Sequence, residues 1–258
     1  MLSRDAIADA IRNAPGDGPA LVAFMTAGYP TRQHFATTLC AIANAADVIE
    51  IGVPFSDPMA DGMTIQRSSR VALEQGVTLD WILAELATLK NRLAAPLLLM
   101  SYLNPLLSYG LARLPADMRR AGVAGLVVPD LPYEEGTELR AALDGQGLAL
   151  VQMATPVTPP SRLVMLARES RGFVYAVTMA GTTGSEAALP DQVFEYLDRV
   201  RQIAQVPVCA GFGVRSAKQV AGLAGHTDGV IVGSALVEAL ERGEDPAAFL
   251  RGLRNGPR

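Results

Sequence analysis

One acidic residue interrupts an otherwise apolar stretch of the chain. Glu50 lies between Ile49 and Ile51 in the sequence DVIEIGVP. If this stretch forms a β-strand, the alternation of side chains puts Glu50 on the face opposite to the two isoleucines. An unpaired carboxylate is costly to bury, so such a group stays near a rim, finds a partner or takes up a proton. A carboxyl group with a raised pKa is suited to general acid–base catalysis near neutral pH.

Two interpretations of Glu50 remain open on these grounds. In the first, Glu50 points into the interior of the fold and acts as a catalytic acid and base. In the second, it is a core glutamate held in a salt bridge. The neighbouring apolar stretches contain no lysine or arginine that would pair with it, which favours the catalytic interpretation.

Two aspartates follow Glu50 on a segment rich in proline and acidic residues, PFSDPMADGMTIQ. Asp57 and Asp61 stand beside proline and glycine, and this setting is typical of turns. Taken alone, each is as compatible with a structural role as with a functional one. Because Asp61 comes soon after the strand that carries Glu50, we expect its side chain to project toward the same end of that strand.

Two short glycine-containing motifs indicate a phosphate site. The motif GFGV covers Gly211–Val214 and GSAL covers Gly233–Leu236, and each follows an apolar stretch. Free backbone N–H groups and the positive end of a helix dipole bind anions, and glycine allows a close approach. Thr183 and Gly184, on a small and polar loop further upstream, are candidates to close over the same anion.

These candidates need a fold that brings their segments together. Short apolar stretches alternate with helical spacings of three and four residues, as in Leu79, Ile82 and Leu86, from one end of the chain to the other. Continuous apolar stretches are expected of parallel strands that are buried on both faces. The expected strands are Ala20–Met25, Asp47–Val53, Pro96–Tyr102, Gly125–Pro129, Leu148–Met153, Phe173–Val177, Pro207–Gly211 and Gly229–Val232.

Eight such units fit the length of the chain, because a barrel of eight strand–helix units typically needs about 250 residues. We therefore predict an α/β protein that forms a (β/α)8 barrel as one domain over residues 1–258. An extra N-terminal helix would cover the bottom of the barrel, and extended loops would follow the second and sixth strands. In this fold the loops after the strands carry the chemistry, and those after strands seven and eight often bind phosphate.

Composition removes several classes of function. The net charge of −4 and the isoelectric point near 5.3 argue against nucleic acid as a partner. No apolar stretch reaches 18 residues and the N-terminus does not resemble a signal peptide, so we expect a cytoplasmic protein without a membrane span. Cys40 and Cys209 are interpreted as buried small hydrophobic residues. His34 and His226 are isolated, which argues against a transition-metal site.

The absence of a lysine from the expected strands argues against a Schiff-base aldolase. Four aromatic residues are weaker candidates, since each is equally compatible with core packing and with lining an apolar pocket. They are Phe24, Tyr102, Tyr175 and Phe212. Residues alone leave a phosphosugar isomerase on the same barrel as an alternative function.

The segment IEIGVPFSDPMADGMTIQ resembles the signature of the tryptophan synthase alpha subunit family. Further motifs support the resemblance in the order expected of the family: AFMTAGYP, MSYLNPLLSYG, VVPDLPYEE, GTTG, GFGV and GSAL. The resemblance covers essentially the full chain. It implies a lyase that cleaves indole-3-glycerol phosphate to indole and glyceraldehyde 3-phosphate by a retro-aldol reaction.

The resemblance also implies roles for individual residues. Glu50 would carry the proton to the indole ring, and Asp61 would pair with the indole N–H and stabilise the cationic intermediate. Tyr175 would lie close to Glu50. The remaining substrate-binding residues are Phe24, Tyr102 and Phe212 beside the indole ring, and Thr183, Gly184, Gly213, Gly233 and Ser234 around the phosphate.

The family usually acts in an αββα complex with a pyridoxal-phosphate beta subunit, whereas the alpha chain itself needs no cofactor. The contact surface implied for the beta subunit is the loop around Pro58 together with Asp130–Pro132. Met63 departs from the proline common in the family, and AGTTG departs from the usual form of its loop. The alternatives are a lyase that works alone and a non-catalytic activator of the beta subunit.

Overall fold

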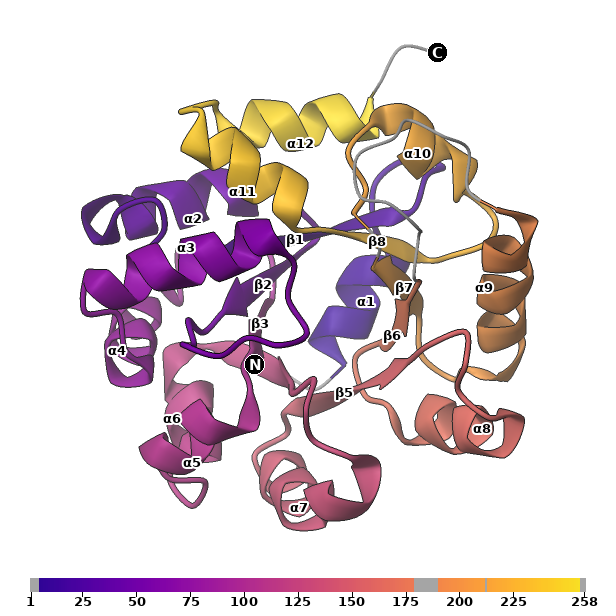
Figure 1. Ribbon diagram of the computed structural model, residues 1–258, viewed down its shortest axis with the longest axis horizontal. Coiled ribbons are helices and arrows are strands. Elements are labelled where there is room, and N and C mark those ends of the chain that lie inside the picture. The colour runs from indigo at the N-terminus through magenta and orange to yellow at the C-terminus, as the bar shows by residue number, and fades with distance from the viewer. Residues whose placement is uncertain (1–4, 179–189, 212, 256–258) are drawn as a thin grey trace.

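The structure, a computed structural model, describes residues 5–178, 190–211 and 213–255. Eight parallel strands pair in chain order and close into a barrel, because β1 pairs with both β2 and β8. Figure 1 shows the strands in the centre and the helices around them. The strands are β1 (Ala20–Thr26), β2 (Val48–Gly52), β3 (Leu97–Met100), β4 (Val123–Val127), β5 (Ala149–Ala154), β6 (Val174–Val177), β7 (Val208–Gly211) and β8 (Gly229–Val232).

Helices form the outer layer of the molecule, and capping residues fix several of their starts. Thr78 accepts a hydrogen bond from the Trp81 amide, and Ser216 forms a reciprocal capping box with Gln219. The outer elements are η1 (Arg32–His34), α2 (Phe35–Ala43), α3 (Met63–Glu74), α4 (Leu79–Leu89), α5 (Leu103–Tyr109), α6 (Leu114–Ala121), η2 (Tyr133–Gly136), α7 (Thr137–Gly145), α8 (Pro160–Glu169), α9 (Asp191–Ile203), α10 (Ala217–Gly222), α11 (Ser234–Glu241) and α12 (Pro246–Arg254).

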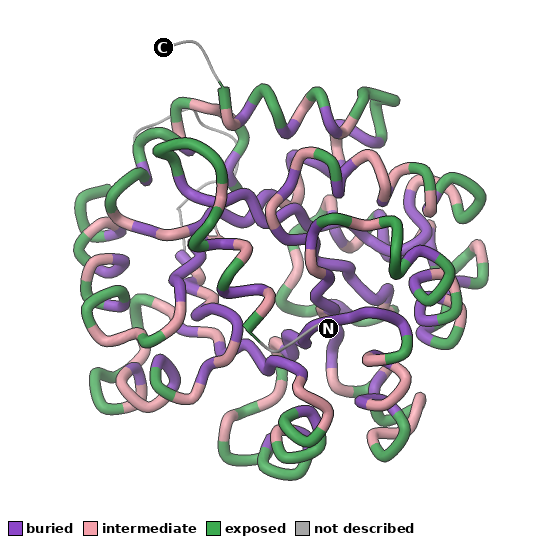
Figure 2. Tube along the Cα trace, turned by 180° about the vertical axis from the view of Figure 1, so that it is seen from behind, coloured by how far each residue is buried: buried purple, intermediate pink, exposed green. Residues whose placement is uncertain are grey.

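Two apolar layers hold these elements together. One lies between strands and helices and contains Ile49 and Ile51 of β2. The other fills the lower part of the barrel, where Ile7 and Ile11 of α1 (Ala6–Arg12) pack on side chains from the strands, including Val48 of β2. Figure 2 shows buried residues concentrated along the central strands and exposed residues on the outer sides of the helices.

The predicted (β/α)8 barrel and the extra N-terminal helix are confirmed. The extended segment after the second strand is present: residues 53–62 precede α3, and both α3 and α4 lie between β2 and β3. Most of the second extended loop, residues 179–189, lies outside the described residues. The fourth strand is shifted from the expected Gly125–Pro129 to Val123–Val127, because Val123 already pairs with Leu97 of β3. Within the described ranges, none of the helices has the length and apolar character needed to cross a membrane.

Candidate active site

Glu50 points into the barrel from the middle of β2, where Phe24 of β1 and Leu98 of β3 are its neighbours in register. Its side chain is fully buried, and neither carboxyl oxygen has a hydrogen-bond partner among the described residues. Burial raises the pKa of Glu50 to about 8, with a smaller contribution from the negative charge of Asp61. The carboxyl group is therefore largely protonated at neutral pH, and it is poised to exchange a proton.

Asp61 lies on the long loop between β2 and α3, where the Asp61 carbonyl accepts a hydrogen bond from the Gln66 side chain at 2.8 Å. Partial burial raises the pKa of Asp61 to about 6, while a hydrogen bond from the Tyr102 hydroxyl lowers it. The two carboxyl groups thus have different environments. At neutral pH Asp61 is mainly ionised and Glu50 mainly protonated, which separates a base from an acid.

Tyr102 holds the Asp61 loop in place from the end of β3. Its hydroxyl oxygen accepts a hydrogen bond from the Ala60 amide at 2.9 Å, and its ring lies 5.4 Å from the ring of Phe55. Burial, followed by the charge of Asp61, raises the pKa of Tyr102 to about 12, so the hydroxyl keeps its proton. Phe55 was not predicted as a site residue, although it belongs to the same acidic loop segment as Asp61.

Two glycines leave room for two aromatic rings of the site. A Cβ atom on Gly52 would stand 2.5 Å from the ring of Phe24, and one on Gly211 would stand 2.5 Å from the ring of Tyr175. Burial, and then the charge of Glu50, raises the pKa of Tyr175 well above its ordinary value. Both rings therefore lie against strand backbones, at positions that a larger residue would displace.

The described part of the phosphate motifs lies at the same end of the barrel. Gly213 adopts a left-handed conformation with φ of 58°, which favours glycine. Gly233 directly precedes α11. A Cβ atom on Gly233 would stand 3.7 Å from the ring of Phe24. Ser234 is the first residue of α11, where backbone N–H groups have no partner within the helix. Thr183, Gly184 and Phe212 lie outside the described residues.

A family model described as the tryptophan synthase alpha chain matches residues 12–253. This chain belongs to the tryptophan synthase alpha chain family. The family resemblance found in the sequence is thereby confirmed.

Individual relatives match over nearly the full length. The tryptophan synthase alpha chain of Nitratidesulfovibrio vulgaris is 46% identical over 243 residues, with 93% of this chain and 95% of the relative covered. A chain of M. tuberculosis tryptophan synthase in its aminoacrylate-bound form superposes with a TM-score of 0.87 at 35% identity, covering 99% of this chain and 100% of that one. A chain of the Pyrococcus furiosus a2b2 complex gives a TM-score of 0.85 at 35% identity, covering 92% and 97%.

Of the residues expected in the site from likeness to the tryptophan synthase alpha family, the described ones gather at one end of the barrel. Glu50, Asp61 and Tyr175 influence one another electrostatically, and Phe24 lies between Gly52 and Gly233. Cys209 is free and buried, as predicted, and lies in the lower apolar layer, whereas Cys40 is free but only partly buried against the outer apolar layer. Among the residues that the structure describes, no group of three or more potential metal-binding side chains occurs.

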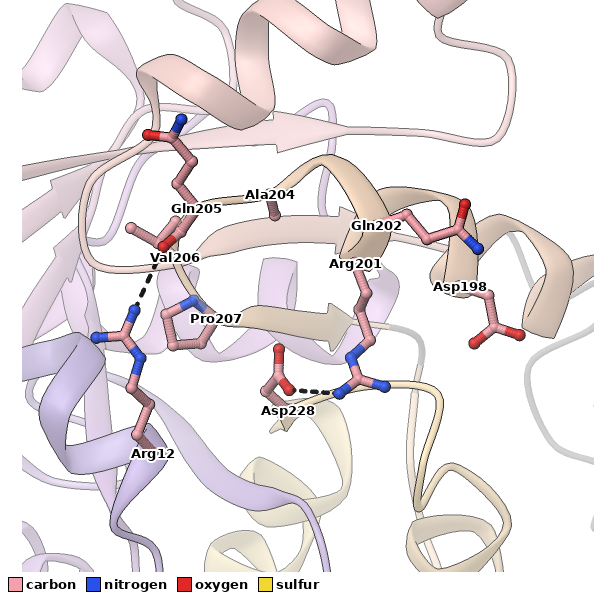
Figure 3. A pocket seen from close by; sticks show the side chains of 9 residues that line it. All are labelled: Arg12, Asp198, Arg201, Gln202, Ala204, Gln205, Val206, Pro207 and Asp228. Carbon is pink, nitrogen blue, oxygen red and sulfur yellow. Dashed lines mark hydrogen bonds and ion pairs between the residues drawn. The ribbon is translucent and has the colours of Figure 1, made fainter.

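A separate pocket of about 520 Å³ opens at the other end of the barrel (Figure 3). Both of its arginines are engaged: Arg12 donates to the Gln205 carbonyl at 3.3 Å, and Arg201 pairs with Asp228 at 3.0 Å. These groups precede β1, β7 and β8, whereas Glu50 and the glycine motifs lie toward the strands' other ends.

Proposed function

We propose that this chain cleaves indole-3-glycerol phosphate to indole and glyceraldehyde 3-phosphate in the biosynthesis of L-tryptophan, with Glu50 as the proton carrier. The observation that carries the proposal is a buried carboxyl group without a hydrogen-bond partner in the described structure, whose pKa is raised to about 8. Such a group is protonated when substrate arrives, and it is set to give a proton and to take one back.

The reaction needs both movements of the proton. Glu50 gives its proton to C3 of the indole ring, which becomes a cationic indolenine. The bond between C3 and the glycerol chain then breaks, its electron pair returns to the indole ring, and the hydroxyl of the adjoining carbon becomes the aldehyde. The proton released from this hydroxyl returns to Glu50, so the carboxyl group ends as it began.

Asp61 is proposed to accept a hydrogen bond from the indole N–H and to stabilise the positive charge of the indolenine. This role requires an ionised carboxylate, and the pKa of about 6 leaves Asp61 ionised at neutral pH. A fixed negative charge next to a developing positive charge lowers the barrier, because it needs no reorganisation during the reaction. Tyr102 supports this role, because its hydroxyl donates a hydrogen bond to Asp61.

We propose that aromatic side chains bind the indole part of the substrate and that backbone N–H groups bind its phosphate. Phe24, Tyr102 and Phe212 would contact the indole, and Tyr175 would lie close to Glu50. The phosphate would lie at the N-terminus of α11, near Gly233 and Ser234, where unpaired N–H groups and the helix dipole favour an anion. Gly213, Thr183 and Gly184 complete the proposed set around the phosphate.

The beta subunit is the partner of this chain, as in the tryptophan synthase complexes to which its structure is similar. Large apolar side chains are exposed at the active-site end, in the loops after β2 and β5 and at the start of α3: Met59 is 93% exposed, Val157 84% and Met63 76%. Exposed apolar residues of this kind support a docking surface around Pro58 and Asp130–Pro132. We propose that the complex acts in the cytoplasm, where the biosynthetic pathway provides its phosphorylated substrate.

Release of glyceraldehyde 3-phosphate from indole-3-glycerol phosphate tests the proposal directly. The purified chain should release it slowly, and faster when the beta subunit is added. Glu50→Gln should lower kcat by roughly a thousandfold, because removing a general acid and base costs about 10²–10⁴ in rate, and it should leave substrate affinity nearly unchanged.

The exposed Glu195 on α9 offers a matched control. Glu195→Gln removes a carboxylate in the same way and should leave turnover as in the wild type. Turnover by the Glu50→Gln variant at the wild-type rate would exclude Glu50 as the proton carrier. A wild-type chain that releases no product, alone or with the beta subunit, would instead support a non-catalytic activator.

A further inference from the structure

Glu238 lies on α11, one turn beyond the proposed phosphate site, and holds together three segments of the chain. Its two carboxyl oxygens accept hydrogen bonds from the Arg215 guanidinium, at 2.6 and 2.9 Å. The oxygen bound at 2.9 Å also accepts a hydrogen bond from the Thr64 hydroxyl, at 3.0 Å. The bidentate pair fixes direction as well as distance, so Glu238 is a junction rather than a single surface ion pair.

The three segments are those that carry the proposed site. Arg215 follows Gly213 in the loop after β7, and Glu238 belongs to the helix that begins at Ser234. Thr64 is the second residue of α3, which begins directly after the loop of Asp61. A single carboxylate therefore connects both phosphate motifs to the helix that anchors the Asp61 loop.

The surroundings of Glu238 make this connection stiff. Ile65 of α3 and Val237 of α11 pack together in an apolar cluster with Phe24, which is one of the proposed indole contacts. A second ion pair joins the same two helices, between Arg67 and Glu241 at 2.6 Å. The side chain of Glu238 is only 23% exposed, and the hydrogen bonds from Arg215 lower its pKa, so the carboxylate stays ionised at neutral pH.

We propose that Glu238 is a positioning residue that couples phosphate binding to the placement of Asp61, an inference that rests on the proposed lyase function. A phosphate at the N-terminus of α11 and beside Gly213 restrains the loop of Arg215 and the helix of Glu238. Because Thr64 is hydrogen-bonded to Glu238, the start of α3 and the loop before it are restrained as well. Neither Arg215 nor Glu238 touches the reacting atoms.

Steady-state kinetics with indole-3-glycerol phosphate separate the contributions of the two partners of Glu238, which are Arg215 on the phosphate side and Thr64 on the side of the Asp61 loop. Arg215→Met should raise KM about fivefold with kcat nearly unchanged, because it loosens the phosphate side. Thr64→Val should lower kcat about fivefold with KM nearly unchanged, because Asp61 acts on charge that develops in the transition state. Glu238→Ala should combine both effects and lower kcat/KM by roughly tenfold or more.

The effect of substituting Thr64 should also depend on the presence of Glu238. Adding Thr64→Val to the Glu238→Ala variant should cause little further loss, since residues that act through one partner are not additive. Thr64→Ser keeps the hydroxyl and should retain the wild-type kcat. Full additivity of the two substitutions, or loss of kcat in Thr64→Ser equal to that in Thr64→Val, would overturn the proposal.

A measurement that does not use turnover keeps this proposal separate from the proposed function. Hydrogen exchange of the amides in residues 53–62 is followed with and without inorganic phosphate. Phosphate should slow exchange about threefold in the wild type and have no such effect in Glu238→Ala. Equal protection in both proteins would overturn the coupling even if the chain is an active lyase, whereas an inactive wild type would overturn only the proposed reaction.

Matched variants guard against general destabilisation. Glu238→Gln keeps the size of the side chain and the acceptor for Thr64 but removes the charge that binds Arg215, so it should reproduce the KM effect alone. Glu134 accepts a similar bidentate pair from Arg162, at 2.6 and 3.0 Å, on other elements. Glu134→Gln in the isolated chain should leave kcat, KM and the phosphate effect unchanged, and an effect equal to that of Glu238→Gln would contradict a specific role.

Discussion

Carboxylates at the two ends of the barrel have opposite surroundings. At the bottom, Asp47 accepts hydrogen bonds from the Leu21 amide and from Arg254, both at 2.7 Å. Asp228 accepts from the Val208 amide at 2.8 Å and pairs with Arg201. In the interior nearer the top, Glu50 has no hydrogen-bond partner within the described structure.

The difference separates stability from chemistry. A carboxylate that joins the start of one strand to an arginine of another element ties the barrel together. A carboxyl group that is more deeply buried and has no hydrogen-bond partner among the described residues weakens the fold when it is charged, and such a cost is typical of sites where a proton must move. The partners of a buried acid, and not its burial alone, therefore indicate its role.

The strongest way to sharpen this comparison is to neutralise Asp61 without changing its shape. Asp61→Asn should lower kcat/KM about a hundredfold to a thousandfold, the effect expected when one group that stabilises transition-state charge is lost. In the wild type, kcat/KM should rise with pH through about 6, as Asp61 ionises, and fall through about 8, as Glu50 loses its proton. The rise near pH 6 should be absent from the variant.

Asp57 is a control on the same loop, because it is exposed and accepts a hydrogen bond from its neighbour Ser56. Asp57→Asn should retain wild-type kcat/KM in the isolated chain. If both asparagine variants lost activity equally, the loop as a whole and not the charge of Asp61 would be responsible.

The second prediction concerns the cost of keeping Glu50 unpaired. The pKa of Glu50 is raised from 4.5 to about 8 in the folded chain, so the folded state binds more protons than the unfolded state between these values. The contribution of Glu50 to stability is thus full below about pH 4.5 and is lost as the pH rises through about 8. Glu50→Gln should be more stable than the wild type at pH 9, by a few kcal/mol at most, and nearly equal at pH 4.5.

Urea denaturation at the two pH values measures this difference. The Glu195→Gln control should show no comparable change between them. A Glu50→Gln variant that is less stable than the wild type at pH 9 would mean that the carboxylate has a favourable partner.

The third prediction tests the opposite end of the barrel. Asp47→Ala leaves the Leu21 amide and Arg254 without their acceptor, and the Asp47 side chain is only 9% exposed. We expect a loss of about 2–3 kcal/mol in the free energy of unfolding, as for other buried groups that lose a charged partner. The kcat of the folded variant should be unchanged, and a large loss of kcat at a temperature where it is fully folded would contradict the division between the two ends.

The smallest predicted effect is steric. A methyl group on Gly52 must displace the ring of Phe24, so Gly52→Ala should lower kcat/KM about tenfold, equivalent to about 1.4 kcal/mol. Gly222, at the end of α10, has nothing within 4 Å of an added Cβ. Gly222→Ala should leave kcat/KM unchanged, and equal losses in both variants would show that the Phe24 contact is unimportant.

Local sequence pattern was sufficient for the barrel and for the orientation of Glu50. The period of two in a strand turns Glu50 away from Ile49 and Ile51 whatever surrounds it, and the structure has this arrangement. The catalytic roles of Glu50 and Asp61 stay predictions. The start of β4 was misplaced, because pairing of Val123 with β3 depends on the neighbouring strand and not on the local apolar pattern.

Contacts between distant segments could not be predicted from the sequence. Tyr102 gave no sign that its hydroxyl binds the Asp61 loop, since a tyrosine at the end of a strand is equally compatible with simple packing. Glu238, Arg215 and Thr64 belong to three segments that meet only in the folded barrel, and each reads as an ordinary surface residue. A hydrogen bond between such residues depends on the relative placement of whole helices, which no short window of sequence specifies.

The closure of the strand ring sets an order on the assembly of this chain. The helix α1 precedes all eight strands along the chain, yet the apolar surface on which Ile7 and Ile11 rest includes Cys209 of β7 and Ile231 of β8. The helix α1 can therefore pack fully only after β7 and β8 have been made. In the same way, β1 can pair on one side only after β8 has been made. Nascent chains that stop before β7 would leave both surfaces open, so we expect them to depend on chaperones until the final strands leave the ribosome.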